Sequence, residues 1–108
     1  MIVYERDEDG VLVAAAGIPE AWVREAPGVR VRGLPTHFGV LDFAIAAEGV
    51  ARVRARFGGR CRPPGGLVLE SPLAAPLRGV FVDGRERRVD DPQRVVLAEI
   101  PSEIVLLY

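Results

Sequence analysis

The sequence of 108 residues lacks several residue types, and each absence narrows the functions open to the chain. It contains no lysine, which excludes the lysine-bearing phosphate loop of nucleotide-binding proteins. Its single cysteine, Cys61, excludes an internal disulfide. Its single histidine, His37, would have to serve any Ser-His or Cys-His catalysis and most transition-metal sites.

Aromatic residues and long apolar runs are also scarce. Aromatics make up 6% of the chain, too few to predict a platform on which bases or sugar rings stack. No apolar run reaches transmembrane length, and the acidic N-terminus lacks the apolar segment of a signal peptide. The formal net charge of −1 gives no general attraction to nucleic acid. We expect no membrane or nucleic-acid partner and, for the chain as written, a cytoplasmic location; for a piece of a longer protein the location stays unknown.

What the sequence has in abundance is a series of short apolar runs separated by turn signals. Turn signals recur about every ten residues, no strand–helix–strand rhythm is visible, and no domain boundary or repeat interrupts the chain. The pattern predicts a single all-β domain over residues 1–108, an antiparallel two-layer β-sandwich of eight to ten strands. The expected strands of the first half are 2–6, 11–16, 29–32, 40–46 and 51–57, with a loop over 33–39. Those of the second half lie within 67–72, 77–82, 95–97 and 100–108.

One segment breaks the strand pattern and predicts a helical turn. Pro19 has the φ of a first helical position, Glu20 favours the positive helix end, and Pro27 follows as a stop. We expect Ile18 and Trp22, with Val23 as a further candidate, to share one face and cap the end of the sandwich. The predicted core comprises Val3, Val11, Val13, Trp22, Val29, Val31, Leu41, Phe43, Ile45, Val53, Phe57, Val68, Val80, Val82, Val96, Ile104 and Leu106.

No catalytic constellation can be assembled from the sequence. His37 has no carboxylate or cysteine within a few residues, so a packed or surface loop histidine is the plainer interpretation. Cys61 lies between two arginines, which could favour a thiolate, although an inert thiol is the plainer interpretation. The scattered carboxylates cannot be paired across a cleft as a glycosidase requires. We therefore expect no enzyme activity, no catalytic residue, no metal and no cofactor.

Two groups of residues are candidates for an interaction surface. All 14 basic residues are arginine. Those at alternate positions of the expected strands 29–32 and 51–57 form two rows, each on one face of its strand, and on adjacent strands the rows would make one positive stripe. Such rows could bind anions, or they could be a solvent face neutralised by nearby acids. The other group is the helical turn and the Leu34–Phe38 loop, which we expect to pack together at one end. The candidate residues are Trp22, His37, Phe38, Arg30, Arg32, Arg52, Arg54 and Arg56.

Several motifs resemble one known group of proteins. They are Gly17-Ile18-Pro19-x-x-Trp22, Leu34-Pro35-Thr36-x-Phe38-Gly39, Pro63-Pro64-Gly65-Gly66-Leu67, Val82-Asp83-Gly84 and the ending Ile100-Pro101-x-Glu103-Ile104-Val105-Leu106. The chain resembles the C-terminal β-sandwich of bacterial proteins built on an (α/α)₆ toroid, the glycogen-debranching or six-hairpin-glycosidase-like group. In that group the catalytic carboxylates belong to the toroid, so the resemblance carries no catalytic residue over to this chain.

The resemblance implies a non-catalytic accessory domain of a carbohydrate-active protein, excised from it or standing alone. Its expected partner is the catalytic domain of a parent or neighbouring protein, with carbohydrate as a further candidate. The alternative is a small ligand-binding module that uses its arginine-rich sheet faces for acidic glycans or phosphorylated partners. The third alternative, a small enzyme, would depend on His37.

Overall fold

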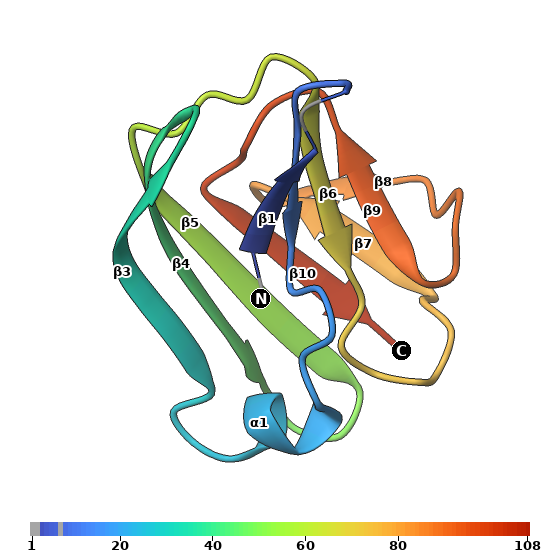
Figure 1. Ribbon diagram of the computed structural model, residues 1–108. Coiled ribbons are helices and arrows are strands. Elements are labelled where there is room, and N and C mark those ends of the chain that lie inside the picture. The colour runs from blue at the N-terminus through green and yellow to red at the C-terminus, as the bar shows by residue number, and fades with distance from the viewer. Residues whose placement is uncertain (1–2, 7) are drawn as a thin grey trace.

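The protein is a β-sandwich of two stacked sheets, which confirms the predicted fold class (Figure 1). The computed structural model describes residues 3–6 and 8–108, so residue 2 of the first expected strand lies outside the described part. One sheet has four strands in the order β1-β2-β6-β9: Val3–Arg6, Val11–Ala14, Gly66–Glu70 and Arg94–Leu97. The other has the order β3-β4-β5-β10-β7-β8: Val29–Thr36, Gly39–Ala47, Arg52–Gly59, Glu103–Leu107, Gly79–Val82 and Arg85–Arg87. All pairs are antiparallel except β2 with β6.

The central strands of the six-stranded sheet follow the alternation that their sequences predict. Residues of β4, β5 and β10 point alternately into the core and out to solvent, because successive side chains of a strand lie on opposite faces. The Phe43 and Phe57 rings face each other across β4 and β5 with centroids 5.3 Å apart. The core prediction is confirmed for this sheet at Leu41, Phe43, Ile45, Val53, Phe57, Val80, Val82, Ile104 and Leu106.

In the four-stranded sheet the core prediction is confirmed at Val3 on β1, whereas β2, β6 and β9 reverse the predicted orientation of their side chains. The inner face of this sheet carries Val3 and then the alternate residues Leu12, Ala14, Leu67, Leu69, Val95 and Leu97. Val11, Val13 and Val68, which were predicted for the main core, are buried in a separate cluster on the outer face. Val96 was also predicted to be buried, and it is 67% exposed. The prediction failed here because these strands are apolar on both faces, so alternation cannot assign the sides.

Strand β3 is longer and less buried than expected. A bulge between Val31 and Leu34 continues the strand, so the loop predicted over 33–39 shrinks to the turn at His37 and Phe38. Gly33 has a φ of +64° there, and its N–H donates to Asp42 Oδ1 at 2.7 Å. Val29 and Val31 are only half-buried, because β3 is an edge strand lying beyond the area that the smaller sheet covers (Figure 1).

The predicted helical turn is α1, Glu20–Arg24. Val23 is buried against the core, and Ile18 just before the helix is buried too. Trp22 is 54% exposed, so its assignment to the core was wrong. Adjacent residues of a helix point about 100° apart, so the side that buries Val23 cannot also bury Trp22. In the described part of the chain no helix has the length and apolarity to cross a membrane.

Strand β8 follows a two-residue turn that the sequence indicates. Asp83 and Gly84 both have positive φ, 50° and 81°, which suits the tight turn of a β-hairpin. The Asp83 carboxylate accepts hydrogen bonds from the backbone N–H groups of Ser102 and Glu103 at 3.0 and 2.9 Å. The strand itself was not predicted, because all three of its residues are charged and exposed.

Candidate functional site

The outer face of the six-stranded sheet carries the predicted arginine rows on both sides of strand β4. Arg30 on β3 and Arg56 on β5 are both directly paired with Ala44 of β4. Arg54 is paired with Ala46, one step further along the same face. Small side chains on β4 therefore separate taller arginines on its two neighbours. The structure brings the two predicted rows together on one face.

Acidic neighbours neutralise only part of this face. The Arg54 guanidinium donates to Glu48 at 2.9 Å and to Glu103 at 2.8 Å. Hydrogen bonding from Arg54 is the main cause that lowers the pKa of the Glu48 carboxyl. Arg56 lies 3.7 Å from Glu103, too far for a hydrogen bond. Among the described residues, no ion pair forms at Arg30, Arg32 or Arg52.

The outer face of the four-stranded sheet is apolar along one line. Strand register places Tyr4 beside Val13, Val13 beside Val68, and Val68 beside Val96. These four residues, called the apolar strip below, cross all four strands. The two central valines are shielded by their neighbours, whereas Tyr4 and Val96 at the ends are 41% and 67% exposed. The strip was not predicted as a site, because its valines were assigned to the core.

Charged groups of both signs lie near the two ends of the apolar strip. On β1, Arg6 pairs with Asp9 at 2.9 Å. On β9, Arg94 lies 3.9 Å from Asp91. An apolar centre with a polar, charged rim is the usual anatomy of a protein–protein interface.

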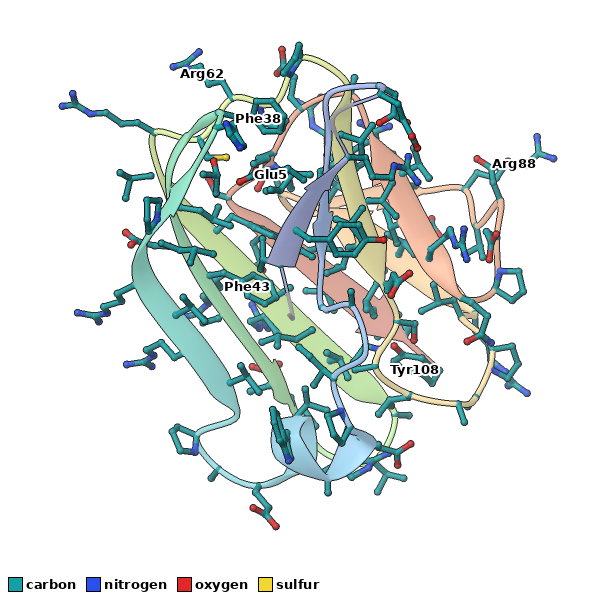
Figure 2. The ribbon with its side chains drawn as sticks, in the orientation of Figure 1. Glu5, Phe38, Phe43, Arg62, Arg88 and Tyr108 are labelled. Atoms are coloured by element: carbon teal, nitrogen blue, oxygen red, sulfur yellow. The ribbon has the colours of Figure 1, made fainter. Side chains whose placement is uncertain are left out.

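His37 contacts the carboxylate of Glu5. It sits in the β3–β4 turn, where its Nε2 is 3.2 Å from Glu5 Oε2 and its backbone N–H donates to Glu5 Oε1 at 3.1 Å. Figure 2 shows Glu5 and Phe38 near the same end of the sandwich. Within the described ranges, no group of three potential ligands could hold a metal ion. The contact between Glu5 and His37 links edge strand β1 of one sheet to the β3–β4 turn of the other.

Trp22 and Phe38 do not form the predicted cluster. Phe38 precedes β4, while Arg24 of the Trp22 helix contacts the carbonyls of Gly49 and Val50, beyond the other end of β4. Nine residues of strand separate the two places by roughly 30 Å. Figures 1 and 2 show α1 and Phe38 at opposite ends of the molecule. The hypothesis of a joint Trp22–Phe38 surface was therefore wrong.

A further hollow lies at the Phe38 end. It encloses about 560 Å³ between residues 57–64 and 98–102. Arg60, Arg62, Glu99 and Ser102 are its polar side chains, and prolines form much of the remaining wall. Cys61 is buried there with its sulfur 3.4 Å from Thr36 Oγ1, so it does not present a reactive thiol to solvent.

The chain has no significant match among protein-family models, curated proteins or solved structures. The expected membership of the glycosidase-associated group thus rests on the sequence motifs alone.

Proposed function

We propose that this domain is a non-catalytic interaction module, and that it docks through the apolar strip onto another protein domain. The observation that carries the proposal is the two-sided apolarity of the four-stranded sheet. Strands with apolar residues on both faces are typical of sheets that are covered on both faces. Here the inner face packs on the six-stranded sheet, and the outer face leaves Val96 and Tyr4 exposed.

The proposed occupant is the catalytic domain of a carbohydrate-active protein, encoded in the same chain or by a neighbouring gene. The resemblance of the sequence motifs supports this choice, and the mixed charges of Arg6, Asp9, Asp91 and Arg94 suit a protein surface better than a membrane or a polyanion. Finding no (α/α)₆-toroid domain in the parent chain or its gene neighbourhood would refute this choice of partner.

Where such a domain is encoded, one pair of variants tests the docking surface. Val96→Glu places a charge on the strip, and Val50→Glu places the same charge on another exposed valine, in the β4–β5 turn. We expect Val96→Glu to weaken binding to the toroid domain by about tenfold or more, since a charge would be buried at the interface. Val50→Glu should leave it unchanged. Equal affinities of the two variants would contradict the proposal, and so would self-association that Val96→Glu abolishes without any toroid binding.

A further inference from the structure

The arginine face opposite the apolar strip has the form of a trough. Its floor consists of Asp42, Ala44 and Ala46 on β4, and its walls are Arg30 and Arg32 on β3 and Arg54 and Arg56 on β5. Each wall stands one strand spacing, about 4.8 Å, from the floor. The two walls are therefore about 10 Å apart at their Cα atoms, which lets side chains from both converge on one anionic group.

The trough extends along the sheet rather than forming a single pocket. An open hollow of about 200 Å³ around Ala46 shares Arg30, Ala44 and Arg56 with a second hollow of about 370 Å³. The second hollow shares Phe57 and Gly58 with the large hollow at the end of the sandwich, where Arg60 and Arg62 lie. Shared lining residues thus connect the three hollows into one path with arginines along its whole length.

The charges of the trough leave room for an anionic ligand. Arg54 is already held by Glu48 and Glu103, and the Asp42 carboxylate on the floor accepts a hydrogen bond from the Gly33 N–H. Arg30 and Arg32 form no ion pair in the described part of the chain. Guanidinium groups bind carboxylate and sulfate oxygens in a two-pronged geometry. The trough therefore suits a ligand that carries several such groups at intervals along an extended chain.

The geometry points to an acidic polysaccharide as the ligand of this trough, held by arginines on both sides of β4. Recognition rests on the acidic groups of the polymer, because the floor of Asp42, Ala44 and Ala46 offers no aromatic ring on which a sugar could stack. The same floor disfavours single-stranded nucleic acid, whose bases stack on aromatic side chains. An acidic peptide would bind by adding a strand to an open sheet edge, and that edge lies on the far side of β3, outside the trough, while β4 at the floor is paired on both sides. The inference does not depend on docking through the apolar strip, which lies on the other sheet.

Two double variants of equal charge test the trough. Arg30→Glu with Arg56→Glu changes the two walls, and Arg85→Glu with Arg87→Glu makes the same change of charge on the exposed edge strand β8. Binding is measured by titration calorimetry with polygalacturonate and with heparin at low salt, and thermal melting checks that each variant folds. We expect the wall variant to lose binding by about tenfold or more, because counterion release and paired contacts are both lost. The β8 variant should change it by less than about twofold.

Several outcomes would overturn the inference. The inference fails if neither polysaccharide binds to the unmodified protein. It also fails if the two double variants lose binding equally. Tighter binding of poly-glutamate or of single-stranded DNA, measured in the same buffer, would assign the trough to a peptide or a nucleic acid instead. Because no toroid domain is present in this experiment, its failure leaves the docking proposal intact.

Discussion

Glu5 on β1 holds the β3–β4 turn through both of its carboxylate oxygens, one bonded to the His37 backbone N–H at 3.1 Å and one 3.2 Å from His37 Nε2. The two residues are 32 positions apart: Glu5 belongs to edge strand β1 of one sheet, and His37 lies in the turn that follows edge strand β3 of the other. The contact closes one side of the sandwich near its N-terminal strand. The single histidine of the chain is thus used structurally, mainly through its backbone.

Substitutions at the two ends of this contact should have unequal effects. Glu5→Ala removes both interactions and is expected to cost about 1 kcal/mol of unfolding free energy. His37→Ala keeps the backbone hydrogen bond and loses only an exposed side-chain contact, for less than about 0.5 kcal/mol. Urea unfolding measures both. A loss for His37→Ala as large as that for Glu5→Ala would show that the imidazole, not the backbone, makes the link.

The core of the six-stranded sheet should depend strongly on Phe43. Its side chain is 1% exposed and packs on Phe57, so Phe43→Ala is expected to cost about 3–5 kcal/mol. Phe81→Ala serves as the control, since this half-buried ring lies on the outer face of β7 and should cost less than about 2 kcal/mol. Similar losses in denaturant unfolding would place the two rings in equivalent environments, against the structure.

The end of the sandwich at α1 should be anchored by Val23 rather than by Trp22. Val23→Ala removes buried methyl groups and is expected to cost about 2 kcal/mol. Trp22→Ala should cost less than about 1 kcal/mol, because half of the indole already contacts water. Thermal melting of the two variants decides between them. A larger loss for Trp22→Ala would restore the indole as the plug of this end.

The C-terminal tyrosine should make stability fall at high pH. Burial raises the pKa of the Tyr108 hydroxyl above its ordinary value; the hydrogen bond with Ser71 Oγ, at 2.6 Å, opposes the shift, and the Glu20 charge adds to it. A group whose pKa is higher in the folded state keeps its proton longer when folded than when unfolded. The contribution of the Tyr108 hydroxyl to the free energy of unfolding is therefore complete below pH ~10, the pKa of an unfolded tyrosine. It is lost as the pH rises above that value.

The variant Tyr108→Phe isolates this effect. Its melting temperature should decline less than that of the unmodified protein as the pH rises above ~10, because the titrating hydroxyl is gone. At neutral pH it should lose only about 1 kcal/mol, since Ser71 Oγ can still donate to the Leu73 carbonyl. Parallel pH profiles for the two proteins would mean that the Tyr108 hydroxyl is equally solvated in both states.

The sequence was sufficient for the fold wherever polar and apolar residues alternate. Strands β4 and β5 have mainly charged or small residues on one side and apolar residues on the other, so their faces were assigned correctly. The faces of β2 and β9 were reversed, because valine, leucine and alanine occupy both sides. Strand β8 was missed because it has no apolar residue, and the extension of β3 was missed because Gly33 and Pro35 resemble a loop.

The alternation of polar and apolar residues also decided how far each candidate site could be predicted. The arginine rows were found, since strand periodicity alone places Arg52, Arg54 and Arg56 on one face. Their neighbour relation to Arg30 across Ala44 depends on sheet order, which local pattern does not contain. The apolar strip was hidden in the predicted core. Its signal was present as runs of apolar residues too continuous for a sheet with one solvent face.

Chemical-shift mapping tests the docking claim most directly. The ¹⁵N-labelled domain is titrated with the (α/α)₆-toroid domain encoded in its parent chain or gene neighbourhood, and backbone amide shifts are followed. Docking through the apolar strip predicts that the perturbed amides cluster at Tyr4, Val13, Val68 and Val96, while those of β3 to β5 stay unchanged. Shifts confined to the arginine face, or a spectrum that does not change at saturating toroid domain, would contradict it.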